Sequence, residues 1–291
     1  MKLYSPSTIK EIRDKYGFRF SKSLGQNFLT DKNIIDQIIE GSEIGPEDMV
    51  LEIGPGIGVI TSEAADIAKK VTAIEIDSDL IPILQETVGF RDNVEIINAD
   101  ILKTDIKGLI AGERENLSSD ARVRVIGNLP YYITTPIIMK LLQEEAAIDT
   151  ITVMMQKEVA DRLKASPATK EFGAISLMVQ YYAEVKEIVK VPKTVFVPQP
   201  KVDSMVLRLD LRDEPPVSPI DRDFMFSVIK AGFSLRRKTL ANSLATLKDY
   251  SKEEVVLGLN EAGIDPVRRG ETLSLEEYAK LSDVLYKMHR E

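Results

Sequence analysis

The chain has 291 residues, of which 44% are hydrophobic and 29% charged, and its net charge is −8; this suits one large globular domain, or a medium domain plus a small one. It contains no cysteine and a single histidine, His289, which argues against disulfides, thiolate nucleophiles, cysteine zinc sites and histidine general bases. No apolar run is long enough to span a membrane and the first residues lack an apolar signal region, so we expect no membrane association and a cytoplasmic location.

Strand-like apolar runs alternate with helix-like stretches along most of the chain. Strands are predicted at 49–53, 71–76, 94–98, 122–126, 151–155, 175–182, 185–191 and 204–209. Helices are predicted around 34–39, after Thr30-Asp31, and at 59–69, 79–88, 135–143 and 158–164. This alternation indicates an α/β protein with a parallel, doubly wound sheet, in which active sites lie at the carboxyl ends of the strands.

The last part of the chain has only helical patterns. A proline-rich, charged stretch at 212–219 is a candidate linker, and it precedes helical patterns at 221–233, 237–247, 252–261 and 275–288. We therefore expect a first domain of residues 1–212 and a small all-helical domain of residues 213–291. Basic residues gather at 1–30, where residues 1–29 carry six basic and two acidic side chains, and again at 236–238. Such basic edges on an acidic body fit contact with phosphates.

A glycine-rich turn follows the first long strand, in the sequence Glu52-Ile-Gly-Pro-Gly-Ile-Gly58. Gly54 and Gly56 allow the backbone to approach a ligand closely. The third glycine of a dinucleotide fingerprint is replaced by Val59, which disfavours NAD. Glu75 ends the second strand, where an acid commonly accepts hydrogen bonds from ribose hydroxyls. Asp100 follows the third strand, where it is placed to read an adenine edge.

The fourth strand runs into Asn128-Leu129-Pro130-Tyr131. The Asn128 oxygen and a backbone carbonyl of Leu129 or Pro130 are suited to accept hydrogen bonds from an exocyclic amine. Pro130 restrains the turn, and Tyr131 offers a ring for stacking. Taken alone, the turn is equally typical of a plain strand end. In order, however, the glycine loop, the two acids and this turn describe an S-adenosylmethionine site beside an amine-acceptor site.

The chain resembles the ribosomal RNA adenine dimethyltransferases, and most of all the bacterial enzymes that dimethylate two adjacent adenines near the 3′ end of 16S rRNA. The resemblance covers nearly the whole chain. It is carried by the segments 22–29, 52–58, 75–77, 98–100, 127–132, 196–204 and 233–239. It implies an S-adenosylmethionine-dependent fold with a Rossmann-like sheet, a helical rRNA-binding domain, and a monomer that acts on 16S rRNA in the assembling small subunit.

The resemblance also implies roles for individual residues. Cofactor contacts are implied for Asn27, Leu29, Gly54, Glu75, Asp100 and Asn128. Phe196, in a Phe-x-Pro-x-Pro segment, is expected to form the second stacking wall opposite Tyr131, although a core Phe is the alternative. Contacts to rRNA phosphates are expected from Lys22, Arg236, Arg237 and Lys238. No metal site is expected.

Other functions remain open at this point. A 23S rRNA adenine methyltransferase is one alternative. A DNA adenine-amine methyltransferase is another, although such enzymes more often have an Asp-Pro-Pro-Tyr-like turn and no DNA-recognition region is evident here. A ribosome assembly factor without catalysis would keep the cofactor fold, and a small-molecule methyltransferase is disfavoured by the basic helical region.

Overall fold

The computed structural model describes residues 2–21, 24–235 and 237–290 of the chain. The chain divides into two compact units, one of Met1–Ala160 with Val185–Leu211 and the other of Asp161–Glu184 with Arg212–Glu291. The expected division had a single boundary after residue 212. The segment Asp161–Glu184 instead belongs with the second unit, because its helix packs on helices from the end of the chain.

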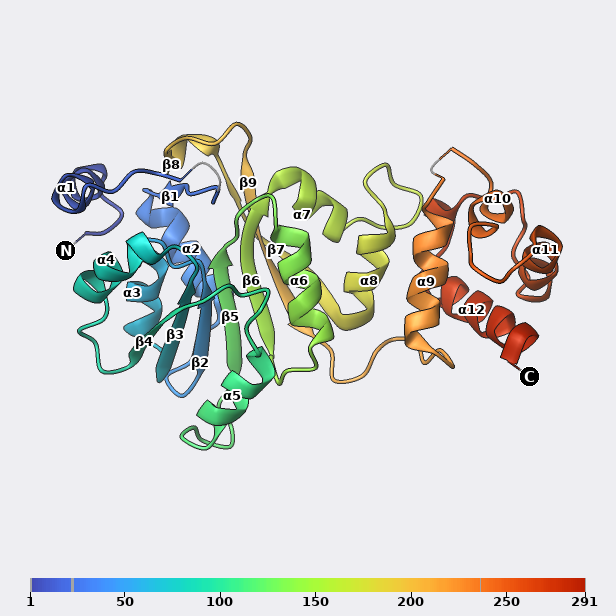
Figure 1. Ribbon diagram of the computed structural model, residues 1–291, viewed down its shortest axis with the longest axis horizontal. Coiled ribbons are helices and arrows are strands. Elements are labelled where there is room, and N and C mark those ends of the chain that lie inside the picture. Colours follow the sequence, from blue (N-terminus) through green and yellow to red (C-terminus); the bar gives the residue numbers. More distant parts are fainter. Residues whose placement is uncertain (1, 22–23, 236, 291) are drawn as a thin grey trace. The chain divides into compact units, whose positions relative to one another are not determined.

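The first unit is built on a seven-stranded sheet in the order β4-β3-β2-β5-β6-β9-β7 (Figure 1). The strands are β2 (Met49–Ile53), β3 (Lys70–Glu75), β4 (Val94–Asn98), β5 (Val123–Asn128), β6 (Thr150–Gln156), β7 (Ala183–Val191) and β9 (Ser204–Leu211). Its helices are α1 (Pro6–Tyr16), α2 (Lys32–Ser42), α3 (Val59–Ala65), α4 (Ile81–Thr87), α5 (Ile106–Arg114) and α6 (Thr134–Gln143), with short 3-10 turns at Ser78–Leu80 and Lys193–Val195. The predicted α/β architecture is confirmed.

The central strands are continuous apolar runs because both of their faces are covered. All five residues of β2 are buried. Strands β2 to β6 pair in parallel, so that Ile53 lies beside Ile74 and Gly127, and Glu75 beside Asn98. The carboxyl ends of β2, β3, β4 and β5 therefore meet at one edge of the sheet, as the sequence predicts.

Two predictions of secondary structure are wrong. The run expected as a strand at 175–182 is a helix, α8 (Ala174–Tyr182), because its apolar side chains bury at helical spacing, among them Leu177, Met178 and Tyr181. The sheet is also not wholly parallel, since β9 runs antiparallel to β6. Helix α5 was not predicted; Asp105 caps it by accepting a hydrogen bond from the Gly108 amide at 2.8 Å.

A second, two-stranded sheet joins distant parts of the sequence. Strand β1 (Phe28–Leu29) pairs antiparallel with β8 (Phe196–Val197), and Leu29 lies opposite Phe196. In Figure 1 this pair lies at the top of the first unit. The Thr30 amide extends the contact by donating to the Val195 carbonyl at 2.8 Å. This pairing brings the N-terminal segment next to the Phe-x-Pro-x-Pro segment.

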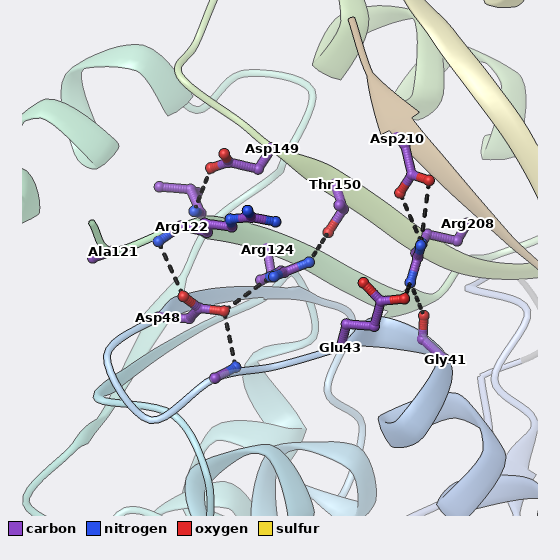
Figure 2. Close-up of polar contacts among 12 residues, drawn as sticks. Gly41, Glu43, Asp48, Ala121, Arg122, Arg124, Asp149, Thr150, Arg208 and Asp210 are labelled. Atoms are coloured by element: carbon purple, nitrogen blue, oxygen red, sulfur yellow. Dashed lines mark hydrogen bonds and ion pairs between the residues drawn. The ribbon is translucent and has the colours of Figure 1, made fainter. Parts of the chain in front are cut away.

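Buried ion pairs hold the opposite edge of the sheet, at the amino ends of β2 and β5 (Figure 2). The side chains of Asp48 and Arg124 are 8% and 5% exposed and meet at 2.9 Å. Asp48 also accepts hydrogen bonds from the amides of Gly45 and Arg122 at 2.9 and 3.0 Å. Burial opposes ionisation of Asp48, but these hydrogen bonds outweigh it and lower the pKa of the carboxyl. Nearby, Arg208 in β9 bridges Asp210 at 2.7 Å and the carbonyl of Gly41 at 2.9 Å.

The regular secondary structure described for the second unit is helical, except at Ala183 and Glu184, where β7 begins. It contains α8, α9 (Arg222–Gly232), α10 (Leu240–Leu244), α11 (Lys252–Glu261), a 3-10 turn at Gly270–Thr272 and α12 (Leu275–Arg290), and α7 (Lys157–Leu163) leads into it. Tyr278 is fully buried and donates to the Gly270 carbonyl at 3.1 Å. Gly232 permits this packing, since a Cβ there would lie 2.4 Å from the Tyr278 hydroxyl. No helix in the described ranges is long and apolar enough to cross a membrane.

Candidate active site

A cavity opens at the carboxyl ends of β2 to β5. It is lined by side chains or backbone of every residue predicted to contact the cofactor. These residues are Asn27, Leu29, Gly54, Gly56, Glu75, Asp100 and Asn128. The parallel register explains why loops from four strands meet there, and the two-stranded sheet adds Asn27 and Leu29.

The glycine loop forms one wall of the cavity. Gly54 and Gly56 have φ angles of +68° and +64°, which favour glycine over residues with a side chain. A Cβ on Gly56 would lie 3.0 Å from the Phe28 ring, so the loop packs directly on the N-terminal segment. At Gly54 the nearest atom to such a Cβ is the Asn128 carbonyl oxygen, at 3.9 Å. The bare backbone of Gly54 is thus open to a ligand.

Glu75 presents a carboxylate that the protein itself holds in place. Its Oε2 accepts from the Gly56 amide at 3.2 Å and its Oε1 from the Asp77 amide at 2.9 Å. Burial raises the pKa of Glu75 to about 6, and the two backbone donors and the carboxyl of Asp77 modify this shift. At neutral pH the group is therefore ionised and suited to accept hydrogen bonds from hydroxyls.

Glu52 is a second acid at this cavity, and sequence reasoning had given it no role. It is 1% exposed, and burial together with the charge of Glu75 raises its pKa to about 8. The neighbouring Thr61 hydroxyl counteracts part of this rise, and Glu52 Oε2 is one of the buried oxygens for which the described residues offer no well-formed hydrogen bond. The cavity thus combines a neutral acid at Glu52 with an ionised one at Glu75 at pH 7.

The N-terminal segment is tied to the cavity by side-chain hydrogen bonds. Gln26 donates to the Asp77 carboxylate, and its own oxygen accepts from the Ser21 amide at 2.7 Å. Asn27 donates to the Gly25 carbonyl at 2.8 Å. The Asn128 side-chain NH2 donates to the Asn27 carbonyl at 2.9 Å. This last hydrogen bond engages the nitrogen of the Asn128 side-chain amide and not its oxygen.

The Asn128 turn consequently offers two acceptors. With its NH2 bound to Asn27, the Asn128 side-chain oxygen is the end of the amide left for a ligand in the cavity. The Pro130 carbonyl already accepts from the Ile133 amide at 3.1 Å and from the Thr134 hydroxyl at 3.0 Å. Of the two carbonyls considered from the sequence, that of Leu129 is the less engaged, although Leu129 is 1% exposed and does not line the cavity, whereas Pro130 does. The Leu129 amide is anchored to the Met154 carbonyl at 3.1 Å.

The two expected stacking walls are placed differently from each other. Tyr131 is half-buried, and its hydroxyl oxygen is hydrogen-bonded to Ser204 Oγ at 2.7 Å. Burial raises the pKa of the Tyr131 phenol. Phe196 is 3% exposed and belongs to the hydrophobic core of the first unit. Neither residue lines the cavity. The burial of Phe196 matches the alternative of a core Phe, and its stacking role stays a prediction.

Two exposed residues of the cavity were also missed from the sequence. Ile76 and Tyr132 are exposed by 48% and 58%, and both line the cavity. Each directly follows a residue that had been singled out, Glu75 or Tyr131, so position in the motif was an available signal. Ile76 gives an exposed apolar surface next to the Glu75 carboxylate, on which a planar group can pack.

The predicted phosphate-binding residues are divided between the described and undescribed parts of the chain. Arg237 and Lys238 are exposed in the second unit. Lys22 and Arg236 lie outside the described residues.

Comparison with known proteins agrees with this geometry. The family model "Ribosomal RNA adenine dimethylase" matches residues 17–287. "Ribosomal RNA small subunit methyltransferase A" of Bacillus cytotoxicus is 52% identical over 284 residues, 97% of this chain and 96% of that protein. The protein of the same name from Alkaliphilus metalliredigens is 52% identical over 282 residues, 97% of each chain.

Two solved structures, of an rRNA methyltransferase and of a dimethyladenosine transferase, are similar to this chain over most of its length. A dimethyladenosine transferase from Plasmodium falciparum has a TM-score of 0.72 at 25% identity, over 87% of this chain and 95% of that one. The 23S rRNA methyltransferase ErmE has a TM-score of 0.65 at 30% identity, over 89% of this chain and 99% of that one. The matched family model spans nearly the whole chain, and the site described above lies within the match. The chain belongs to the ribosomal RNA adenine dimethylase family and uses S-adenosylmethionine.

Proposed function

We propose that this protein transfers methyl groups from S-adenosylmethionine to the exocyclic amines of two adjacent adenines near the 3′ end of 16S rRNA, in the assembling small subunit. One observation carries the proposal: the Asn128 amide is oriented by the Asn27 carbonyl so that its oxygen is left for a donor in the cavity. The names of the relatives at 52% identity support the small subunit as the source of the RNA.

The cavity residues fit the cofactor by their chemistry. S-adenosylmethionine, when bound, supplies an already activated methyl group on a positively charged sulfur. Glu75 is suited to its ribose hydroxyls, Ile76 and Asp100 to its adenine, and the bare backbone at Gly54 to close approach of its chain. Asn27 and Leu29 contribute from the N-terminal side of the same cavity.

The Asn128 turn orients the amine that receives the methyl group. The lone pair of an adenine amine is delocalised into the ring, which makes the nitrogen a poor nucleophile. The Asn128 side-chain oxygen and the Leu129 carbonyl oxygen each accept a hydrogen bond from one of the two N–H groups of the amine. This favours a pyramidal nitrogen with its lone pair directed into the cavity. Catalysis then depends on positioning and on pre-oriented dipoles. The alkylated amine is acidic and loses its proton to water, so no side-chain base is required.

The target base has to leave its stack, at a cost of a few kcal/mol. Tyr131 is placed by Ser204 next to the acceptor turn and is our candidate for one stacking wall. A stacking role for Phe196 requires its ring to become exposed when RNA binds, since it is buried here.

The exposed basic side chains of Arg237 and Lys238 are the proposed phosphate contacts of the second unit, together with Arg236 and with Lys22 of the N-terminal segment. Such contacts fix the register of an RNA without reading its sequence. We further infer a monomer that acts in the cytoplasm, where small subunits assemble.

The experiment is to incubate the protein with methyl-labelled S-adenosylmethionine and, separately, immature small subunits, large-subunit RNA and plasmid DNA, and to map the label. We expect label on two adjacent adenines of the small-subunit RNA only. Label confined to large-subunit RNA or to DNA would refute the proposed substrate. Absence of label with all three would favour an assembly factor that does not catalyse. Asn128→Ala provides the control for transfer at this site.

A further inference from the structure

Tyr132 is the aromatic side chain most open to solvent at the cavity. Its exposed fraction is 58%, while Phe196 is 3% exposed and Tyr131 is half-buried with its hydroxyl on Ser204. Tyr132 lines the cavity and the other two do not. Of the three aromatic rings in these two motifs, Tyr132 alone has both ring surface to offer and a position at the site.

The ring of Tyr132 lies next to the N-terminal segment. A Cβ built on Gly25 would lie 3.8 Å from two ring carbons of Tyr132 and 3.7 Å from the Pro130 Cβ, which is ordinary van der Waals contact. Gly25 has a φ angle of +64°, a conformation that favours glycine. One side of the ring is therefore close to Gly25, while much of its surface stays open.

Tyr132 and Ile76 reach the cavity from the ends of different strands. Ile76, the other exposed side chain at the cavity, follows Glu75 at the end of β3. Tyr132 follows the Asn128 turn at the end of β5, on the acceptor side. An open aromatic ring beside the acceptor turn is suited to a base of the RNA, because every base has a face that stacks on an aromatic ring.

We infer that Tyr132 is a specificity-determining residue that stacks on the nucleobase adjacent to the target adenine. This inference rests on the proposed function and deepens it. When one of two neighbouring adenines has its amine at Asn128 and Leu129, the other stays close to the mouth of the cavity, where Tyr132 lies. The stacked neighbour then helps to hold the target in register.

The test compares Tyr132→Leu, Tyr132→Phe and wild type, with Phe90→Leu as the matched control, since Phe90 is 70% exposed and does not line the cavity. Substrates are small subunits reconstituted with 3′-terminal rRNA that is intact or carries one abasic nucleotide on either side of a target adenine. Steady-state methyl transfer gives KM and kcat for the RNA, and titration with S-adenosylhomocysteine gives the cofactor Kd of the free enzyme.

On intact RNA we expect Tyr132→Leu to raise KM for the RNA by about 5- to 150-fold, the range that the loss of one base–aromatic stack produces. Tyr132→Phe should retain wild-type values, since stacking does not need the hydroxyl, and Phe90→Leu should also be unchanged. On the RNA that lacks the neighbouring base, wild type and Tyr132→Leu should become equal, because the stacking partner is gone.

Several outcomes would overturn the inference. An undiminished penalty of Tyr132→Leu on both abasic RNAs would show that the ring contacts something else. A weakened cofactor Kd with an unchanged KM for RNA would place the ring over the cofactor. Equal activity of Tyr132→Leu and wild type on intact RNA would remove the role altogether. If wild type methylates no small-subunit RNA, the proposed function itself fails, so the two failures are distinguishable.

Discussion

Replacing Glu75 by Gln is expected to weaken cofactor binding by a predictable amount. Both carboxylate oxygens of Glu75 accept a backbone amide, from Gly56 and from Asp77. Gln carries one NH2 group in place of an oxygen, so one of these amides loses its acceptor, and the negative charge is lost. A hydrogen bond to a charged group contributes about 1.5–3 kcal/mol. Loss of one such bond to a ribose hydroxyl corresponds to a Kd about 10- to 150-fold weaker.

The raised pKa of Glu75 adds a pH dependence to this prediction. The pKa of about 6 results first from burial, and hydroxyl donors bind the ionised form. Below about pH 6 the free protein carries a proton there that must be released on binding, so wild-type affinity should fall about tenfold per pH unit. Above that pH it should be level. Glu75→Gln has no proton to release and should show no step at this pH.

Calorimetric titration with S-adenosylhomocysteine at pH 5, 6, 7 and 7.5 measures both effects. Glu115→Gln is the matched control, because Glu115 is an exposed carboxylate that does not line the cavity. The reasoning is refuted if Glu75→Gln binds as tightly as wild type at pH 7.5, or if wild-type affinity is the same at pH 5 and pH 7.5.

Three further predictions follow from buried or exposed charges. Burial raises the pKa of Glu52 from 4.5 to about 8, so the stability of the neutral buried form is full below pH 4.5 and is lost progressively as the pH rises from 4.5 to about 8. Glu52→Gln should therefore raise the melting temperature more at pH 9 than at pH 5, and an equal difference at both would contradict this. Asp48→Ala leaves the Arg124 guanidinium buried without its carboxylate, and urea denaturation should show a loss of about 3–5 kcal/mol; a loss below 1 kcal/mol would argue against the buried pair. The double change Arg237→Ala with Lys238→Ala should weaken rRNA binding and reduce the slope of log affinity against log salt by about 1–2, whereas an unchanged slope would exclude phosphate contacts there.

The cofactor cavity was largely predictable from the sequence because parallel strands place their carboxyl ends at one edge. Gly54, Glu75, Asp100 and Asn128 each end or follow a strand, and the register brings them to one cavity. Asn27 was expected only from the family resemblance. Its place depends on the pairing of β1 with β8, a contact between distant parts of the chain that no local pattern encodes.

The misses have the same origin. The apolar run at 175–182 fits a strand or a helix locally, and packing with helices from the end of the chain decided for α8. Phe196 belongs to a motif, but its side chain is buried in the hydrophobic core. The Asp48–Arg124 pair joins two strand ends that adjoin only in the folded sheet. Tyr132 and Tyr131 are neighbours with the same side chain, and only the structure distinguishes the open ring from the anchored one.

The central claim is that the Asn128 side-chain oxygen orients the target amine, and single-turnover methyl transfer by Asn128→Ala tests it most directly. Removal of one pre-oriented hydrogen-bonding group of this kind lowers the rate by about 10²–10³-fold. We predict a loss of at least that size on immature small subunits, with the Kd for S-adenosylhomocysteine weakened only in part. A near-normal rate of transfer by Asn128→Ala would contradict the account.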